Sequence, residues 1–341
     1  MASNSPQIGW YGLGSMGRPM AENLQRHLAN NHERPLIYSN RTLSSGDTLK
    51  SLGAVPATEF TDLVRRCDIV FTMIPNDDVL QRLMKLAVAG TSELSNKIFV
   101  DCSTVHPDTI KKLSSDLAKH EAVLLSAPVF GGPSVAVTGG LVFAISGLES
   151  ACRTVEKYIV NVMGRKLIIC GENASNASLL KIGGNIITIS LMEAVGEAQV
   201  FAEKTGLGTE AMEQLITDSF GAIAGGYSKR LTSGIYAPPL DTRPGFGISL
   251  AIKDAKHALS IAGEHDFKLP GLELADRHMQ AAREFGGECL DSSAMYGILR
   301  QQASLSFWNE SSRQGEEYSA TNDTNGGAIQ NNIRSNITGQ Q

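Results

Sequence analysis

The sequence predicts an α/β fold with a mostly parallel sheet, followed by an all-α region. From residue 8 to about 170, short apolar runs alternate with helical patterns. Such alternation is typical of a parallel sheet with helices on both faces. After Gly171 the helical periodicity continues while strand-like segments are hard to find. A glycine-rich turn directly after the first apolar run is the third observation, because that position often opens a ligand-binding α/β domain.

The predicted strands are the apolar runs of the first half of the chain. They cover residues 7–12, 35–39, 69–74, 97–101, 122–126, 141–146 and 166–170. Helical patterns lie between most of them, for example over 16–28 and 108–119. We therefore expect a first domain over residues 1–172, with the boundary near 170–175.

The second half is predicted to be helical. One long helix is expected over 176–204, about 40 Å at 1.5 Å per residue. Further helices are expected over 209–219, 248–265, 270–285 and 292–305, in a second domain over 173–308. Residues 309–341 are rich in Asn, Ser, Gln, Gly and Thr, so we expect a disordered polar tail there.

Composition limits the classes of function. The 341 residues carry a net charge of −5 and are 42% hydrophobic, so the chain can bury a substantial core. Mild acidity argues against a nucleic-acid binder. The five cysteines form no metal-binding pattern, and we expect no metal site. No leader peptide and no uninterrupted apolar run of membrane-spanning length is found, so a cytoplasmic protein without membrane contact is expected.

The turn at residues 12–17 has the pattern G-x-G-x-x-G after a strand and before a helix. Gly12 would permit the tight turn, Gly14 would leave space for a pyrophosphate, and Gly17 would let the helix pack closely. The alternative is an ordinary strand–helix turn with incidental glycines. The context favours a dinucleotide site that also includes the residues between the glycines, namely Leu13, Ser15 and Met16.

The end of the second strand indicates which dinucleotide is used. A free 2′-hydroxyl is usually bound by an acidic residue about 20 residues beyond the glycines. Here the chain reads Asn40-Arg41-Thr42, and the planar guanidinium of Arg41 can bind a 2′-phosphate. We therefore predict NADP(H) over NAD(H). The alternative is that Arg41 only stacks on the adenine.

The glycine segment from Gly12 to Leu24, Gly-Leu-Gly-Ser-Met-Gly-Arg-Pro-Met-Ala-Glu-Asn-Leu, closely resembles the opening signature of the β-hydroxyacid dehydrogenases. Four further segments resemble that family in the same order, and the likeness spans about residues 7–305. They are 101–104 (Asp-Cys-Ser-Thr), 127–132 (Ala-Pro-Val-Phe-Gly-Gly), 181–185 and 253–254. The resemblance implies a Rossmann-like domain, a long connecting helix and a helical domain. It also implies reversible hydride transfer between a nicotinamide and a β-hydroxy acid or the corresponding carbonyl acid, acting on the CH–OH group.

The resemblance also implies site residues. Lys181 matches the family's catalytic lysine, which can stabilise the oxyanion and donate its proton. Asn185 lies one helical turn later and can orient the lysine or the substrate. Gly183 and Gly184 lie between them, at a cost of about 1 kcal/mol each in a helix. This cost is easier to understand if another group packs against the bare backbone.

Other positions are implied around the same site. Gly131 and Gly132 resemble the family's carboxylate-binding turn, but Phe130 stands where the family usually has Ser, which favours a bulkier or less polar substrate. Ser103 is expected to contact substrate or nicotinamide, and Thr104 to cap a helix beside the cofactor. The remaining positions expected near the cofactor are Ile74, Pro75 and Lys253, with Asp254 structural. None of the seven histidines shows a partner pattern.

Two other functions stay open. An imine reductase shares this fold and cofactor but commonly replaces the lysine, so Lys181 argues against it while Phe130 keeps it open. A non-catalytic NADP-binding scaffold would need neither Lys181 nor Asn185. Decarboxylating 6-phosphogluconate dehydrogenase is related, but its helical domain is considerably longer. A homo-oligomer, dimer or tetramer, is expected because long helices often bury a shared interface.

Overall fold

The computed structural model describes residues 5–91 and 93–314. These residues divide into two compact units, one made of the described residues up to 189 together with 250–273, and the other made of 190–249 and the described residues from 274 onward. The tail predicted over 309–341 is only partly described. Residues 315–341 lie outside the described residues, whereas Asn309 donates hydrogen bonds to the Leu231 and Thr232 carbonyls.

The first unit is built on a six-stranded parallel sheet with the strand order β3-β2-β1-β4-β5-β6. This order, with two halves wound in opposite directions from the first strand, is that of a Rossmann-like domain. The α/β fold class is therefore confirmed. The strands are β1 (Ile8–Tyr11), β2 (Ile37–Ser39), β3 (Val55–Pro56), β4 (Ile69–Thr72), β5 (Ile98–Asp101) and β6 (Val123–Ser126).

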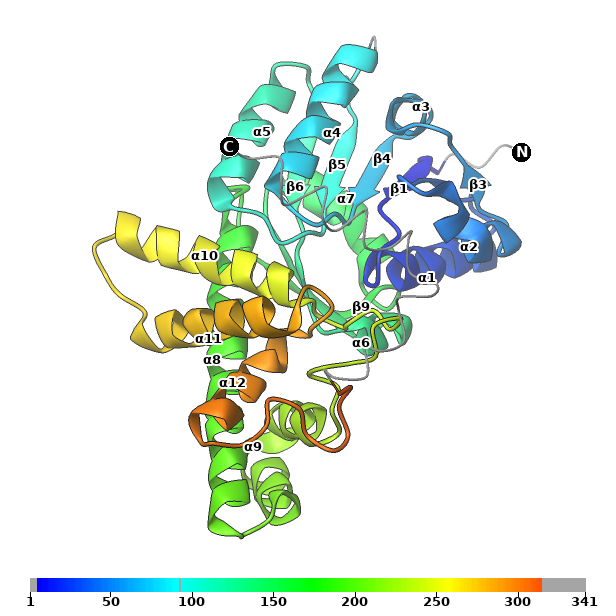
Figure 1. Cartoon of the computed structure of the whole chain (residues 1–341). Helices are drawn as coiled ribbons and strands as arrows, with labels where there is room; N and C mark the ends of the chain where they lie inside the picture. The colour runs from blue at the N-terminus through cyan, green and yellow to red at the C-terminus, as the bar shows by residue number, and fades with distance from the viewer. Residues whose placement is uncertain (1–4, 92, 315–341) are drawn as a thin grey trace, which may run out of the picture. The chain divides into compact units, whose positions relative to one another are not determined.

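Helices cover both faces of this sheet (Figure 1). One core contains side chains of α1 (Gly17–Asn30), α2 (Asp47–Ser51) and α7 (Glu149–Ile159). The other contains side chains of α3 (Phe60–Arg66), α4 (Asp77–Gly90) and α5 (Pro107–Ala118). Alternate strand residues enter opposite cores, as Phe71 and Val70 do, because side chains point to opposite faces along a strand.

A second, three-stranded sheet follows in the same unit. Its order is β7 (Val129–Phe130), β8 (Leu141–Ile145) and β9 (Gly164–Ile169), with α6 (Pro133–Val137) between β7 and β8. The pair β7–β8 is antiparallel and the pair β8–β9 is parallel. This sheet places Phe130 opposite Val142 and presents the two glycines that follow Phe130.

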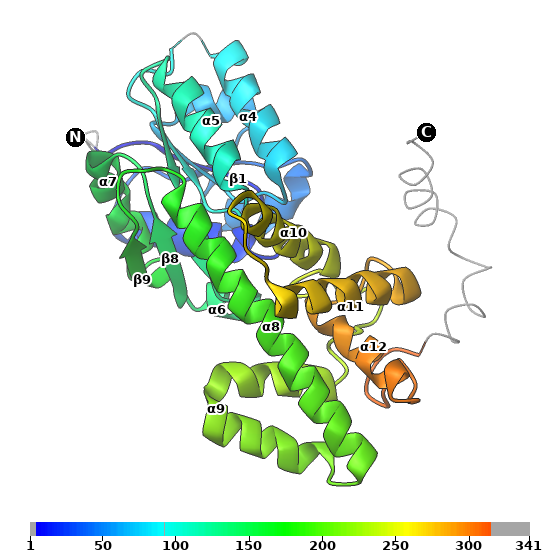
Figure 2. The same ribbon diagram turned by 90° about the vertical axis from the view of Figure 1, so that its left-hand side faces the viewer.

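The long helix α8 (Asn176–Thr205) begins in the first unit and ends in the second (Figure 2). Its start is fixed by serines, because Ser146 accepts from the Ala177 amide and the Ser126 and Ser178 hydroxyls lie 2.9 Å apart. Helix α8 is long and apolar enough to cross a membrane. The core helix of a soluble protein can meet the same two criteria, length and composition. It carries Lys181, Asn185 and Glu193, polar groups that the fold pairs with other side chains.

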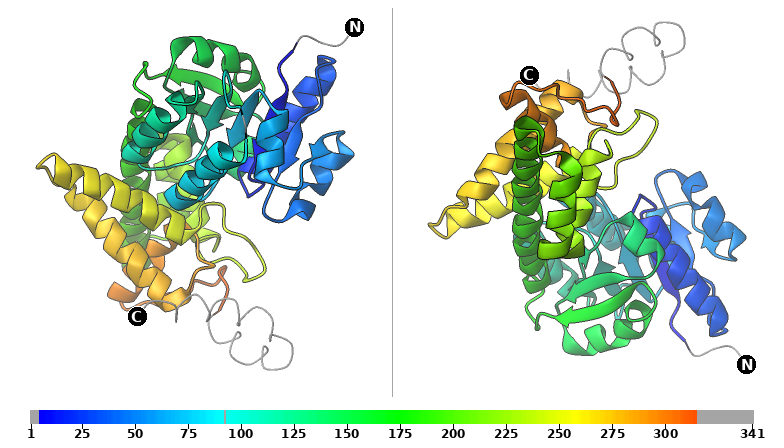
Figure 3. Two further views of the ribbon diagram at one scale, coloured as in Figure 1. Left: turned by 90° about the horizontal axis from the view of Figure 1, so that it is seen from above. Right: turned by 90° about the horizontal axis from the view of Figure 1, so that it is seen from below.

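The second unit is helical, as expected. Its main elements are the end of α8, α9 (Thr209–Thr232), α11 (Pro270–Gly286) and α12 (Met295–Gln302), with η2 (Ser292–Ala294) before α12. Helix α9 runs beside α8 (Figure 3), where Gln199 donates to the Ser228 hydroxyl at 2.7 Å. Most of α10 (Ile248–Glu264) belongs to the first unit.

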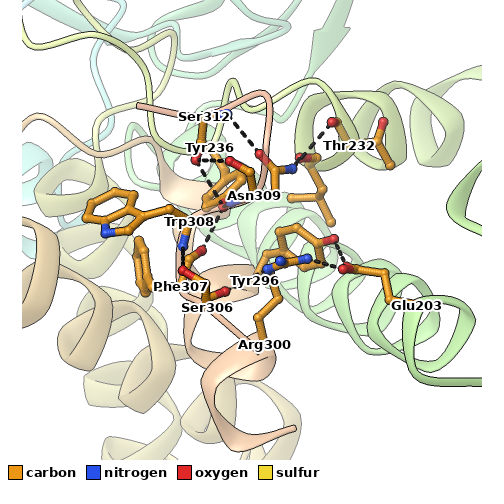
Figure 4. Close-up of polar contacts among 11 residues, drawn as sticks. Glu203, Thr232, Tyr236, Tyr296, Arg300, Ser306, Phe307, Trp308, Asn309 and Ser312 are labelled. Carbon is orange, nitrogen blue, oxygen red and sulfur yellow. Dashed lines mark hydrogen bonds and ion pairs between the residues drawn. The ribbon is translucent and has the colours of Figure 1, made fainter. Parts of the chain in front are cut away.

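Polar side chains of the second unit form hydrogen bonds with the segment 306–312, which follows α12 (Figure 4). Tyr236 donates to the Phe307 carbonyl at 2.7 Å and accepts from the Asn309 amide at 2.8 Å. Glu203 of α8 binds both Arg300 and Tyr296 of α12. The buried Arg300 guanidinium is thus paired with a carboxylate, as low-dielectric surroundings require.

The structure differs from the sequence-based elements in three places. Strands β3 and β7 were not predicted, because each is only two residues long and is too short to show a periodic pattern in the sequence. Helix α9 does not end near residue 219 but resumes after Gly221, whose φ of 86° makes a kink that glycine adopts easily. The expected helix over 292–305 is a short 3₁₀ turn followed by α12, which ends at Gln302.

Candidate active site

The glycine turn after β1 has the geometry that a dinucleotide requires. Gly12 has a φ of 100°, and a Cβ there would lie 2.1 Å from the Met73 carbonyl oxygen. A Cβ at Gly17 would lie 2.0 Å from the Gly12 carbonyl oxygen, so helix α1 packs directly on the turn. Gly14 faces open space, with no atom within 4 Å of an added Cβ. The turn therefore leaves room for a pyrophosphate at the start of α1, with Leu13, Ser15 and Met16 around it.

The end of β2 is tied to this turn by Asn40. Its side-chain oxygen accepts from the Leu13 amide at 2.9 Å, and its amide nitrogen donates to the Thr42 carbonyl at 2.8 Å. Asn40 therefore fixes the shape of the loop. Arg41 and Thr42 are exposed beside it, and the segment from Ser39 to Leu43 contains no carboxylate.

Ser103, expected to contact substrate or nicotinamide, makes hydrogen bonds within the protein. The side chain is buried, its hydroxyl donates to Asp101 Oδ1 at 2.8 Å, and it accepts from the Ile74 amide at 2.9 Å. Ser103 thus holds the end of β4, including Ile74 and the exposed Pro75, next to the end of β5.

Asp101 was not among the predicted site residues, although an acid at the end of an apolar strand is a usable signal. It is fully buried and also accepts from Thr72 at 2.7 Å. Its Oδ2 has no hydrogen-bond partner within the described part of the chain. Burial raises the pKa of Asp101 to about 6, although the hydrogen bonds from Thr72 and Ser103 and the charge of Lys253 act in the opposite direction.

Lys181 lies on α8 against an aromatic ring. Its Nζ is 4.7 Å from the centre of the Phe130 ring, a cation–π arrangement. A Cβ at Gly184 would lie 2.3 Å from the same ring, so Phe130 is the group that packs against bare helix backbone. Burial lowers the pKa of Lys181 to about 8; the Asp254 carboxylate opposes this shift and the Lys253 charge adds to it.

Helix α10 supplies the charged neighbours of this lysine. Asn185 donates to Asp254 Oδ2 at 2.7 Å, and Asp254 is buried. Lys253 Nζ lies 3.0 Å from Asp254 Oδ1 and also donates to the Thr104 carbonyl. The expected structural role of Asp254 agrees with these contacts, and Thr104 contributes its backbone oxygen to them. The expectation that Thr104 caps the following helix is wrong, because α5 begins at Pro107 and its N-cap is His106.

The turn after Phe130 is open on one side. Gly131 has a φ of 122°, and an added Cβ would lie 2.9 Å from Leu141, whereas Gly132 has no atom within 4 Å of an added Cβ. Gly132 directly precedes α6. Backbone N–H groups in such a turn can hold a carboxylate.

A series of contacts within the first unit connects several of the predicted residues. Gly12 meets Met73, next to Ile74; Ile74 is held by Ser103, next to Thr104; and Thr104 meets Lys253. Lys253 and Asp254 then lead to Asn185, Lys181 and Phe130. Arg41 takes part in none of the ion pairs found among the described residues.

Comparison with known proteins identifies the family to which the chain belongs. Residues 7–171 match the family described as the NAD binding domain of 6-phosphogluconate dehydrogenase. Residues 175–299 match the family described as NAD-binding of NADP-dependent 3-hydroxyisobutyrate dehydrogenase. The chain belongs to the β-hydroxyacid dehydrogenase family. It is a nicotinamide-dependent oxidoreductase that acts on the CH–OH group.

Individual relatives span nearly the whole folded part. The NADH-dependent oxidoreductase ucdB of Aspergillus ustus is 28% identical over 86% of this chain and 98% of its own length. The 2-hydroxy-3-oxopropionate reductase of Escherichia coli is 29% identical over 87% of this chain and 98% of its own length.

Solved structures show the same fold. The 3-hydroxyisobutyrate dehydrogenase of Mycobacterium tuberculosis, solved with L-serine, has a TM-score of 0.71 at 25% identity, over 86% of this chain and 99% of its own. An imine reductase from a Pseudomonas species has a TM-score of 0.57 at 16% identity, over 86% and 99% of the two chains.

Proposed function

We propose that the protein catalyses reversible, NADPH-dependent reduction of a carbonyl acid to a β-hydroxy acid, with Lys181 as the general acid. The observation that carries this proposal is the placement of Lys181, whose pKa of about 8 lets the amine gain and lose a proton near neutral pH. The bound cofactor supplies the hydride that adds to the carbonyl carbon. Lys181 Nζ donates the proton that the resulting alkoxide oxygen takes up, and the reverse reaction returns it.

The cofactor preference is proposed from the end of β2. Arg41 is exposed there, and the segment from Ser39 to Leu43 contains no carboxylate that would repel a 2′-phosphate. We expect Arg41→Ala to lower kcat/KM for NADPH at least about tenfold, the loss of one charged phosphate contact, and to leave NADH little changed. Arg82→Ala, an exposed arginine on α4, is the control. An unchanged ratio of the two kcat/KM values would contradict the assignment to NADPH.

The substrate class is proposed from the turn after β7. The open backbone at Gly132 suits a carboxylate, while Phe130 gives the neighbouring wall an apolar surface and no hydroxyl. We therefore expect a substrate with an apolar group beside its carbonyl. Phe130→Ser should shift kcat/KM toward small polar hydroxy acids, measured on a matched series of semialdehydes of increasing side-chain size.

Imine reduction is the second candidate, and the apolar Phe130 ring beside Lys181 favours it. A panel of semialdehydes, keto acids and imines, assayed with NADPH, separates the two. Turnover of carbonyl acids that is abolished by Lys181→Ala supports the first proposal. Turnover of imines that survives Lys181→Ala supports the second, and cofactor binding without any turnover supports a scaffold.

A homo-oligomer is proposed from the surface of the second unit. The end of α8 and helix α9 expose large apolar side chains, with Phe220 at 71% and Ile223 at 74% exposure, together with Phe201, Leu207 and Leu215. Exposed large apolar side chains that are concentrated in one stretch of the chain are typical of a subunit interface. Light scattering should give a multiple of the chain mass that decreases in Phe220→Glu.

A further inference from the structure

Two contacts attach the same face of α10 to the loops at the carboxyl ends of β4 and β5. Lys253 donates to the Thr104 carbonyl, in the loop after β5. One helical turn later, His257 Nε2 lies 3.1 Å from Asp77 Oδ2, at the start of α4 after β4. Residues four apart lie on one face of a helix, so the two contacts act together. Both belong to the first unit.

Asp77 connects three elements. It is the first residue of α4, its Oδ1 accepts from the His106 amide at 2.7 Å, and its Oδ2 meets His257 of α10. The His106 ring lies edge to face with His257, with 5.3 Å between the ring centres. Although partial burial opposes ionisation, the contacts with His257, His106 and Thr109 hold the pKa of Asp77 below its usual range.

The position of α10 matters for the lysine on α8. Lys253 and Asp254 precede His257 by one turn and are the two charged groups that act on the pKa of Lys181. Asp254 also accepts from Asn185, one turn beyond Lys181. A rotation or shift of α10 would therefore change the charges around Lys181 and the orientation of Asn185 together.

We propose that Asp77 and His257 are positioning residues, a latch that fixes α10 so that Lys253 and Asp254 keep Lys181 ready for proton transfer. The role in catalysis rests on the proposed function. The effect on the Lys181 amine does not, because that amine can be measured without turnover. The latch acts through α10, and neither residue is assigned a contact with substrate or cofactor.

The test compares two substitutions at one position in the full chain. His257→Leu removes the contact with Asp77, whereas His257→Gln keeps a side-chain N–H that can reach the same carboxylate. His265→Leu, an exposed histidine just beyond α10, is the matched control. Each variant is measured for the pH dependence of Lys181 acylation by acetic anhydride, for thermal unfolding, and for kcat and KM on the substrate found by the panel.

The latch predicts that His257→Leu shifts the midpoint pH of Lys181 acylation by at least about half a unit, because a displaced α10 moves the charges of Lys253 and Asp254 relative to the amine and changes its hydration. It also predicts that kcat falls at least about fivefold while KM for the cofactor changes less. His257→Gln should restore both values, and His265→Leu should match the wild type. An unchanged Lys181 acylation profile in His257→Leu, or equal defects in the Leu and Gln variants, would overturn the latch. Absence of turnover in every variant would instead count against the proposed function.

Discussion

The glycine turn at residues 12–17 and the lysine site at residues 181–185 prepare for a ligand in different ways. The turn uses backbone: Gly12 and Gly17 touch other backbone atoms, and Gly14 borders empty space. The lysine site uses side chains from distant parts of the chain, since Lys181 depends on Phe130 and on Asp254. A site made of backbone can be predicted from a short local motif. A site made of side chains from distant parts of the chain can be recognised only once the fold is known.

The largest predicted effect breaks the turn. Gly12→Ala forces a Cβ to within 2.1 Å of the Met73 oxygen at a φ of 100°, so we expect a loss of about 3 kcal/mol or more in the free energy of unfolding. Gly14→Ala meets no atom within 4 Å and should change stability by less than about 0.5 kcal/mol while weakening cofactor binding. Denaturant unfolding and cofactor titration check both. Equal stability losses in the two variants would contradict the assigned roles.

The next effect is at the lysine site, where neighbouring glycines form a matched pair. Gly184→Ala places a methyl group 2.3 Å from the Phe130 ring, so we expect a loss of about 1–3 kcal/mol and a displaced ring. Gly183→Ala faces open space inside the same helix and should stabilise the protein by up to about 1 kcal/mol. Thermal unfolding should therefore change in opposite directions. A stable Gly184→Ala would show that Phe130 does not require the bare backbone.

A smaller, pH-dependent effect concerns Asp101 between the two sites. Because burial raises its pKa to about 6, the folded state binds a proton more tightly than the unfolded state. The protonated Asp101 carboxyl therefore adds about 3 kcal/mol to the free energy of unfolding below about pH 4. This contribution is lost as the pH rises through 6. The difference in the free energy of unfolding between wild type and Asp101→Asn should fall from about pH 4 to pH 6 and stay level at higher pH. A difference independent of pH between 4 and 7 would contradict the raised pKa.

The same contrast explains what the sequence could predict. Alternating apolar runs and the glycine motif were sufficient for the fold class, because both are local patterns. Gly183 and Gly184 suggested that something packs on the helix, but the identity of Phe130 required the contact itself. Asp77 and His257 were missed because they lie 180 positions apart in the chain. Asp101 did stand at the end of an apolar strand, but its contact with Thr72, 29 positions away, required the fold. The sequence led us to expect a contact of Ser103 with substrate or nicotinamide. Its hydrogen bond with the Ile74 amide, 29 positions away, could not be predicted because no local pattern pairs the two residues.

The central claim is that Lys181 is the proton donor and acceptor, and the pH dependence of kcat/KM in both directions tests it most directly. Carbonyl reduction requires the ammonium form, so kcat/KM should fall as the pH rises through about 8; alcohol oxidation requires the neutral amine, so kcat/KM should rise through the same pH. Lys181→Ala should lower both rates by about 10²–10⁴-fold and remove this transition. Profiles that stay flat from pH 7 to 9, or a Lys181→Ala variant that keeps most of its activity, would contradict the account.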